Sequence, residues 1–344
     1  MLARAIQPAN LNVSAATDAP SPASAGTSAS AVDVRDLCYS YGDRLALDAL
    51  TLEVPAGAVF GLLGPNGSGK STLLSLLIGR REPASGSVRV LGSPLSARLR
   101  SRLGVVFQEP SLDPNMTVRE TMALQARLFS LPRAEARQRT DMLLERVGLA
   151  ERANSMTPTL SGGMKRRLEL ARALVTNPDL ILLDEPTLAL DPDSRQRLWQ
   201  HLLEANAEGC TLLLATNDVY EAERYCRNVA LLDRGRLAAQ GTPAELKRGL
   251  RRDAVRIEWK GDPAPEADAM RSWPGVGGVR VAGSTTHVTV DEASPFLTRL
   301  FQSSGDRVNG VRIEESTLED VYFQLVGRGI TPRPDGDAEP EEGA

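Results

Sequence analysis

The sequence predicts an α/β fold with a largely parallel central sheet, followed by a smaller α+β unit. In residues 32–247, short apolar runs of strand length alternate with helical patterns, and this alternation is typical of a parallel sheet with helices on its faces. A glycine-rich loop separates one of these strands from the helix after it. Beyond residue 254 the runs alternate between apolar and polar residues, as half-buried strands do.

The first block, residues 32–247, contains the clearest elements. We expect a strand at 59–63 that leads through the glycine loop into a helix at 71–78. Two more buried strands are expected at 180–184 and 211–216, each followed by a helix.

The second block, residues 254–327, is predicted to be a small α+β accessory domain. Its expected strands are 255–259 and 287–290, its expected helices are 294–302 and 316–325, and residues 248–253 connect it to the first block. The predicted helix at 316–325 would open on a capping box formed by Ser316 and Glu319.

Both ends of the chain have the composition of disordered tails. Residues 1–31 are rich in Ala, Ser, Pro and Thr, which indicates either a disordered tail or a start codon assigned too early. Prolines and Asp18 interrupt the apolar residues there, which argues against a signal peptide. Residues 331–344 form an acidic, Pro- and Gly-containing tail.

Composition and charge argue against several classes of function. The net charge of −4, with acidic and basic residues interspersed, gives no basic stripe, so we expect no nucleic-acid partner. The three cysteines, Cys38, Cys210 and Cys226, and the two histidines, His201 and His287, lack metal-ligand spacing, which argues against a structural zinc site. The cysteines are expected to be free thiols. No apolar run approaches the roughly 20 residues that a membrane span needs.

The glycine loop has the spacing of a phosphate-binding loop, G-x-x-x-x-G-K-[ST]. Backbone N–H groups of such a loop and the helix N-terminus that follows form a site for phosphates. Lysine then reaches the β- and γ-phosphates of ATP, and the next hydroxyl coordinates Mg²⁺. A structural glycine turn would not require the Lys70-Ser71-Thr72 sequence. The predicted phosphate-binding residues are Gly64, Pro65, Asn66, Gly67, Ser68, Gly69, Lys70, Ser71 and Thr72.

A pair of carboxylates follows the predicted strand at 180–184. Asp184 ends this strand, where it can hold the Mg²⁺ shell, and Glu185 comes next, where it can polarise the attacking water. Together with the phosphate loop, these residues predict ATP hydrolysis with Mg²⁺ as cofactor.

The stretch Leu160-Ser161-Gly162-Gly163-Met164 lies upstream of Asp184 and resembles the signature of the ATP-binding cassette (ABC) family. Ser161 and the glycines precede a helix expected to begin near Met164, which gives a second N-terminus suited to phosphate. The resemblance covers nearly all of residues 32–247. It implies an ABC ATPase cassette with an antiparallel β subdomain and a helical signature subdomain. Two cassettes, identical or paralogous, would dimerise head to tail, so that Ser161, Gly162 and Gly163 of one close over the ATP of the other.

Other positions match the family in order and spacing. Tyr41 stands where the family stacks an aromatic ring on adenine, and Gln108 stands in the loop that senses Mg²⁺ and contacts the membrane partner. Leu190-Asp191 resembles the loop that crosses the dimer interface. The implied Mg²⁺ ligands are therefore Ser71, Gln108 and Asp184. Taken singly, each match is a weak signal, since Tyr41 is also compatible with a core ring and Gln108 with a surface amide.

One position departs from the family pattern. Where the family usually has a histidine that contacts the γ-phosphate, this chain has Asn217. Asparagine can donate a hydrogen bond to phosphate but cannot carry a proton. We expect hydrolysis that is slower than in a histidine-bearing relative, the alternative being that Asn217 is fully competent.

The segment Ser316-Thr317-Leu318-Glu319-Asp320-Val321-Tyr322 resembles one common in exporter ATPases of the daunorubicin-resistance and nodulation-factor type. This resemblance implies a separate six-helix permease as partner and a peripheral location on the cytoplasmic face of the inner membrane. Two alternatives remain open at this point. One is a soluble ABC ATPase acting on ribosomes or DNA, and the other is a regulatory cassette with low turnover.

Overall fold

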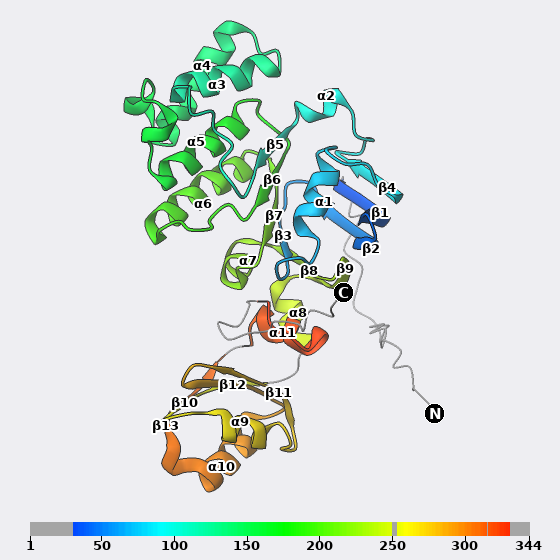
Figure 1. The fold of residues 1–344 in the computed structure, drawn as a ribbon, viewed down its shortest axis with the longest axis vertical. Coiled ribbons are helices and arrows are strands. Elements are labelled where there is room, and N and C mark those ends of the chain that lie inside the picture. The colour runs from blue at the N-terminus through cyan, green and yellow to red at the C-terminus, as the bar shows by residue number, and fades with distance from the viewer. Residues whose placement is uncertain (1–29, 250–252, 315, 331–344) are drawn as a thin grey trace, which may run out of the picture.

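The parallel sheet that the sequence predicts forms the centre of the computed structural model, which describes residues 30–249, 253–314 and 316–330 (Figure 1). Its six strands run in the order β5-β6-β7-β3-β8-β9, and only the last pair is antiparallel. The strands are β3 (Val59–Leu63), β5 (Leu103–Val106), β6 (Leu180–Asp184), β7 (Thr211–Thr216), β8 (Asn228–Asp233) and β9 (Arg236–Gly241).

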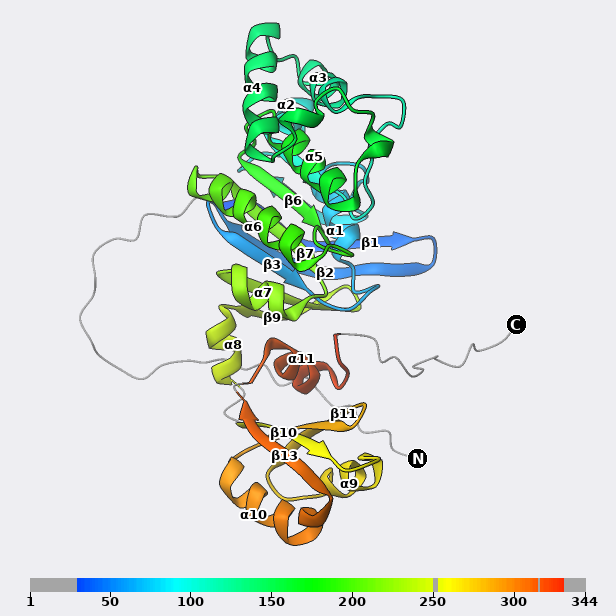
Figure 2. The ribbon, with the colours of Figure 1, turned by 90° about the vertical axis from the view of Figure 1, so that its left-hand side faces the viewer.

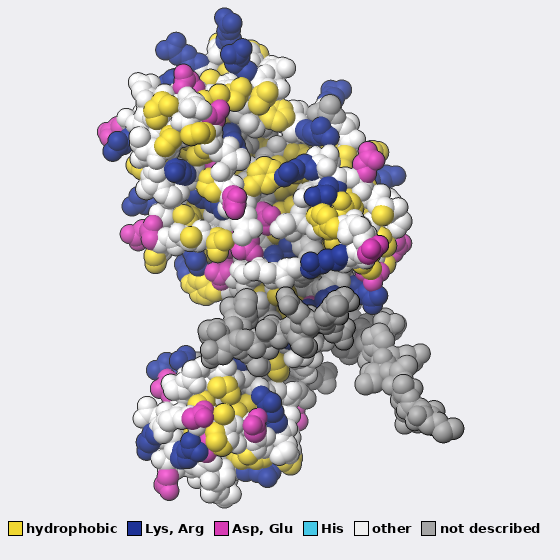
Figure 3. Space-filling model, viewed as in Figure 1, with side chains coloured by type: hydrophobic (Ala, Val, Ile, Leu, Met, Phe, Trp, Pro, Cys, Tyr) yellow, Lys and Arg dark blue, Asp and Glu magenta, His cyan; other side chains and the backbone are white. Residues whose placement is uncertain are grey.

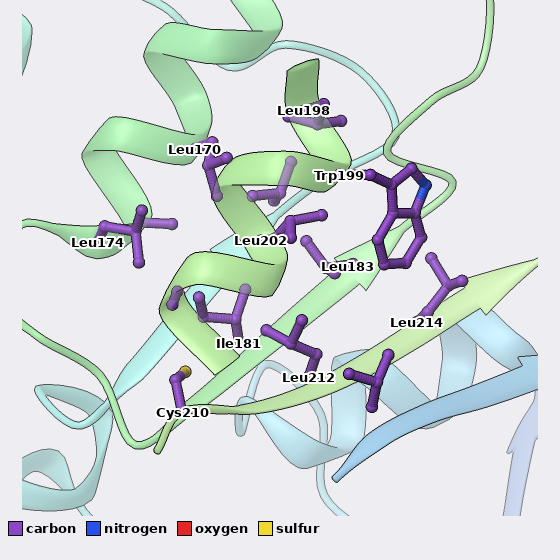
Figure 4. Close-up of a cluster of buried hydrophobic side chains, with 14 of the residues drawn as sticks. Leu170, Leu174, Ile181, Leu183, Leu198, Trp199, Leu202, Cys210, Leu212 and Leu214 are labelled. Carbon is purple, nitrogen blue, oxygen red and sulfur yellow. The ribbon is translucent and has the colours of Figure 1, made fainter. Parts of the chain in front are cut away.

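Both faces of this sheet are buried at its central strands β3, β6 and β7, which are largely apolar, whereas the edge strand β9 is partly exposed. Along β6, Ile181 and Leu183 pack with Leu170 and Trp199 in one hydrophobic cluster, beneath the helices α5 (Gly162–Leu174) and α6 (Pro192–Ala207) (Figure 4). The alternate residues of β6 and β7 join the other cluster with the leucines of α1 (Lys70–Leu77). Such continuous apolar strands are expected when helices cover both faces of a parallel sheet.

Two further layers complete the first block. A three-stranded antiparallel sheet in the order β2-β1-β4 lies beside α1, and a group of helices lies on the other side of the parallel sheet (Figures 1 and 2). Its strands are β1 (Ser30–Tyr41), β2 (Arg44–Pro55) and β4 (Ser85–Val90). The remaining helices of the block are α2 (Ala97–Arg100), α3 (Val118–Leu128), α4 (Arg133–Arg146), α7 (Val219–Tyr225) and α8 (Pro243–Gly249), with the 3₁₀ turns η1 (Ala150–Arg152) and η2 (Thr157–Thr159).

The α+β unit is a four-stranded antiparallel sheet in the order β11-β12-β10-β13. Helices α9 and α10 supply buried side chains to its core, including Met270 and Phe296. The elements are β10 (Asp253–Trp259), α9 (Ala264–Met270), β11 (Val276–Ala282), β12 (Thr285–Val290), α10 (Ala293–Ser304), η3 (Gly305–Arg307), β13 (Val308–Glu314) and α11 (Leu318–Val326).

Helix α11 follows this sheet in the sequence but packs on the first block (Figure 2). Its buried residues Leu318, Val321 and Tyr322 join the cluster that contains β8. The Tyr322 hydroxyl donates a hydrogen bond of 2.8 Å to Asp233 Oδ1. The helix therefore lies between the α+β sheet and the first block, and it contacts both.

Several expected boundaries differ from the structure. The strand β1 begins at Ser30, so the last two residues of the predicted tail 1–31 are ordered in a strand. The rest of that tail, and the predicted tail 331–344, lie outside the described residues. Part of the expected connection 248–253 is regular structure, since α8 extends to Gly249 and β10 begins at Asp253.

The cap of α11 also differs from the prediction. Thr317, not Ser316, is the N-cap, and Asp320 occupies the reciprocal position of the capping box. Glutamate at position 319 fits the usual capping-box pattern, but aspartate at position 320 makes the same reciprocal contact with Thr317. With the Thr317 cap the helix begins at Leu318, whose side chain is buried in the cluster below together with Val321.

Within the described residues, no helix is both long and apolar enough to span a bilayer. Acidic and basic side chains are interspersed over the described part of the face that Figure 3 shows.

Candidate nucleotide-binding site

The glycine-rich loop runs from the end of β3 to the start of α1, as predicted. Gly69 has a φ of 107°, and a Cβ atom there would lie 2.8 Å from Leu47 Cδ2. At Gly64, a Cβ atom would lie 2.4 Å from the carbonyl oxygen of Leu232. Only glycine fits at these two positions. The backbone path that the glycines allow leads to the N-terminus of α1, where the helix dipole favours the binding of an anion.

Lys70 is the first residue of α1, and its side chain is only 5% exposed. Its Nζ donates hydrogen bonds to the carbonyl oxygens of Gly64 (2.7 Å) and Pro65 (3.1 Å). It also lies 3.9 Å from Glu185 Oε1. Burial lowers the pKa of Lys70, and the charges of Glu185 and Asp184 oppose this shift. The ammonium group thus lies between the loop and the two carboxylates.

Asp184 and Ser71 face each other across the mouth of the loop. Ser71 Oγ donates a hydrogen bond of 3.2 Å to Asp184 Oδ1. Burial raises the pKa of Asp184, against the hydrogen bond from Ser71 and the charge of Lys70. A hydroxyl and a carboxylate oxygen are the ligands that Mg²⁺ prefers in proteins, so the two residues fit the predicted metal site.

Glu185 follows β6 in a left-handed backbone conformation, with a φ of 44°. Such a conformation is strained for a residue other than glycine, and it persists only where the surroundings fix it. The Glu185 N–H donates a hydrogen bond of 2.9 Å to the carbonyl of Ala215 on β7. Burial raises the pKa of Glu185, whereas the charge of Lys70 opposes this shift.

Lys70, Ser71 and Glu185 share one cavity of about 690 Å³, a size common for small-molecule sites. Asp184 is not among its lining residues and meets the site through its hydrogen bond with Ser71. Most of the predicted nucleotide-binding residues line the cavity, together with four residues that the sequence did not single out. The predicted residues are Tyr41, Asn66, Gly67, Gly69, Lys70, Ser71, Thr72, Gln108 and Glu185, and the additional ones are Arg44, Leu45, Ala46 and Arg234.

Tyr41 is a wall of this cavity and not a core ring. Its side chain is 42% exposed, and its hydroxyl lies 3.4 Å from Thr72 Oγ1. The guanidinium carbon of Arg81 lies 4.5 Å from the ring centroid. This is cation–π geometry, which holds the ring while leaving part of it accessible.

The signature segment does not line this cavity. Ser161 is the N-cap of α5, and its hydroxyl accepts a hydrogen bond of 3.3 Å from the Met164 N–H. The helix begins at Gly162, two residues earlier than expected, because this cap fixes its first turn. A Cβ atom on Gly162 would have no heavy atom within 4 Å, so this helix N-terminus is open.

Asn217 also lies outside the main cavity, at the end of β7. It lines a neighbouring cavity of about 490 Å³ between α7 and the start of α11. Its strand pairs with β3, and the Gly64 N–H donates a hydrogen bond of 3.3 Å to the carbonyl of Thr216. Asn217 is therefore adjacent in the backbone to a residue that holds the phosphate loop.

Glu221 is a buried carboxylate beneath this region that the sequence did not reveal. It is 1% exposed and accepts hydrogen bonds from Thr187 Oγ1 (2.7 Å), Trp199 Nε1 (2.6 Å) and Thr216 Oγ1 (3.2 Å). Burial raises its pKa, and the hydrogen bonds from Thr187 and Trp199 oppose the shift. It ties the segment after Glu185 to the segment before Asn217.

Arg166 is the second buried charged residue that sequence reasoning missed. It lies on α5 with a side chain 4% exposed, and Glu169, which it pairs with at 3.0 Å, is fully buried. The one available signal was the spacing of this pair, which places both charges on the apolar face of the helix with Leu170.

Two family models match the chain. Residues 47–188 match the model described as ABC transporter, and residues 241–326 match the model described as ATP-binding protein DrrA1-3-like, C-terminal domain. A curated relative from Burkholderia thailandensis, named Nod factor export ATP-binding protein I, is 40% identical over 301 residues, which are 86% of this chain and 97% of the relative.

Solved structures of similar proteins agree with the fold. The protein cbiO1 from Clostridium perfringens, part of the ABC transporter complex cbiONQ, is 34% identical with a TM-score of 0.59, over 64% of this chain and 93% of that one. The dimeric ATP-binding cassette MJ0796, in a post-hydrolysis state bound to ADP and phosphate, is 29% identical with a TM-score of 0.56, over 61% and 98%.

Proposed function

The chain belongs to the ABC transporter family as an ATP-binding and ATP-hydrolysing subunit, and from this premise we propose that it drives export through a separate six-helix permease. In this proposal the chain works as a head-to-tail dimer, of identical or paralogous cassettes, on the cytoplasmic face of the inner membrane. Residues 32–247 are the cassette, and residues 254–327 are its accessory domain.

One observation carries the dimeric part of this proposal. The phosphate loop, Lys70 and Glu185 share a cavity, whereas the open N-terminus of α5 lies outside it. The fold thus has two surfaces suited to phosphate that do not face the same nucleotide. A dimer explains both surfaces, if the α5 N-terminus of each copy closes over the ATP of the other.

The proposed chemistry uses the residues of the main cavity. Adenine stacks on Tyr41, the loop amides and Lys70 hold the phosphates, and the Glu185 carboxylate accepts a proton from the attacking water. The bond between the γ-phosphorus and its bridging oxygen breaks, which leaves ADP and inorganic phosphate. The proposed Mg²⁺ ligands are Ser71, Asp184 and Gln108. When bound, Mg²⁺ would neutralise part of the phosphate charge.

The export assignment rests on the curated relatives, which match most of the chain, and on the family of its C-terminal part. The match to a DrrA1-3-like C-terminal domain covers residues 241–326, and the relative is named Nod factor export ATP-binding protein I. In the proposed cycle, binding of two ATP molecules closes the cassettes and moves the paired permeases, and hydrolysis resets them. A soluble cassette acting on ribosomes or DNA is the competing function.

Fractionation distinguishes these two functions. The tagged chain is expressed in its native host, membranes are washed with high salt, and the detergent extract is purified on the tag. We expect a polytopic membrane protein to co-purify and to change the ATPase rate of the chain. Recovery of the chain with ribosomes or DNA, and with no membrane protein, would instead support the soluble function.

Asn217→His is expected to raise the ATPase turnover of the purified complex by up to roughly tenfold. Residue 217 lies outside the nucleotide cavity but directly follows Thr216, whose carbonyl holds Gly64 of the phosphate loop. The longer histidine side chain can carry a proton, whereas the Asn217 amide cannot. Turnover at saturating ATP is the measurement, and Asn154→His on the exposed surface is the matched control. An unchanged or slower Asn217→His enzyme would mean that asparagine is fully competent here.

A further inference from the structure

Arg166, on α5, donates most of its hydrogen bonds to backbone carbonyls outside its own helix. A guanidinium group has five N–H donors, and here each has an acceptor within the protein. Nε donates to the carbonyl of Pro186 at 2.6 Å, and Nη2 donates to the carbonyls of Gln108 at 3.0 Å and Glu185 at 2.9 Å. Nη1 donates to the Phe107 carbonyl and to Glu169 Oε2.

These acceptors belong to two functional segments that are distant in the sequence. Phe107 and Gln108 form the loop after β5, and Glu185 and Pro186 form the loop after β6. Four of the five hydrogen bonds go to backbone carbonyls, so Arg166 fixes the paths of both loops and not only their side chains.

Glu169 anchors the guanidinium from behind. It is fully buried, and its Oε1 accepts a hydrogen bond of 2.8 Å from the Ser111 N–H while lying 3.5 Å from Arg172 Nη2. A buried pair of this kind holds only if its remaining polar atoms are satisfied, which is the case here. Arg166 is therefore held in one position on α5.

The strained backbone of Glu185 gives this arrangement a consequence for catalysis. Its left-handed φ of 44° aims the carboxylate into the nucleotide cavity, and such strain needs external support. Arg166 provides that support by binding the carbonyls of Glu185 and of Pro186, the residue that follows it.

Arg166 also lies about one turn after the open N-terminus of α5. We propose that Arg166 is a positioning residue for hydrolysis, which couples the α5 N-terminus to Glu185 and Gln108 of the same chain. When α5 contacts the ATP of the partner, any displacement of the helix moves Arg166, and its hydrogen bonds pass this displacement to Glu185 of the same chain. This inference rests on the proposed head-to-tail dimer.

The test compares Arg166→Lys with Arg139→Lys in the purified complex. Lysine keeps the charge but has a single nitrogen, which cannot reach both loops. Arg139 is a matched control, because it donates to the carbonyl of Val175 at the other end of α5, away from the cavity. For Arg166→Lys we expect kcat to fall by about 10- to 100-fold, the scale of effect that a small misplacement of a catalytic group produces. The KM for ATP should change little. The melting temperature should fall, because lysine leaves several of these buried acceptors without a donor. The rates are therefore compared at a temperature at which both variants are folded.

Three outcomes are informative. A kcat within threefold of the wild type overturns the proposal, and so does a loss of kcat matched by an equal loss of folded protein or of ATP affinity. If Arg166→Lys does not fold, Glu169→Gln is used in its place, and the same fall in kcat at unchanged KM is expected. An unchanged kcat in that variant also overturns the proposal. Failure of the proposed function is recognised separately, because the wild-type complex would then itself show no membrane partner and no ATP-dependent dimer.

Discussion

The Glu185→Gln variant is expected to bind ATP and to hydrolyse it at least about 100-fold more slowly than the wild type. Glutamine has the size of glutamate but cannot accept a proton from water, and general-base catalysis contributes about 10²- to 10⁴-fold. The substitution also removes a negative charge from the cavity in which the phosphates are proposed to bind, so the ATP-bound dimer should persist.

Two measurements check this prediction, namely single-turnover hydrolysis and light scattering of the variant with and without ATP. Glu145→Gln on the exposed side of α4 is the matched control and should behave as the wild type does. Turnover within threefold of the wild type in Glu185→Gln would show that another group is the base.

The Lys70→Met variant should lose about 10- to 100-fold in ATP affinity and nearly all turnover. Methionine keeps the length and the packing of the stem but cannot donate hydrogen bonds to phosphate, and a hydrogen bond to a charged group contributes about 1.5–3 kcal/mol. The change also removes the ammonium group that lies 3.9 Å from Glu185 Oε1.

Isothermal titration with ATP measures the affinity directly. Lys260→Met is the control, because Lys260 Nζ donates to the Asp306 carbonyl in the α+β unit, away from the cavity. Wild-type affinity in Lys70→Met would contradict the assignment of the loop as the phosphate site.

The parts of the site that could be predicted from the sequence are those in which chemistry is encoded within a few consecutive residues. The loop with Lys70 and the strand end with Asp184 are of this kind, since a local motif fixes both residue type and position. The main parallel strands were predictable for a related reason, because their buried runs are continuous and bounded by loops.

The residues that were missed act through long-range contacts. Arg166 binds the carbonyl of Phe107, 59 residues earlier in the chain, and no local pattern records that contact. Helix α11 was predicted as a helix, but its position on the first block depends on Tyr322 reaching Asp233, 89 residues away. Boundaries shifted by one or two residues where a cap decided between two acceptable positions, as at Ser161 and Thr317.

The composite site can be tested by mixing two chains that each carry Glu185→Gln and one further substitution. One chain carries Lys70→Met, which disables its phosphate loop. The other carries Gly162→Asp, which places a carboxylate at the open α5 N-terminus, where it should repel the partner's phosphates without a clash in its own fold. Gly249→Asp, also without neighbours within 4 Å, is the control for the added charge.

Each double variant alone should stay monomeric with ATP, because both composite sites of its dimer would be defective. The mixture should form a heterodimer that retains one ATP, since the intact loop of the Gly162→Asp chain then meets the intact α5 N-terminus of the Lys70→Met chain. Dimerisation of the Gly162→Asp chain alone at the level of its Glu185→Gln parent, or a mixture with no ATP-bound heterodimer, would contradict the claim that two copies build each site.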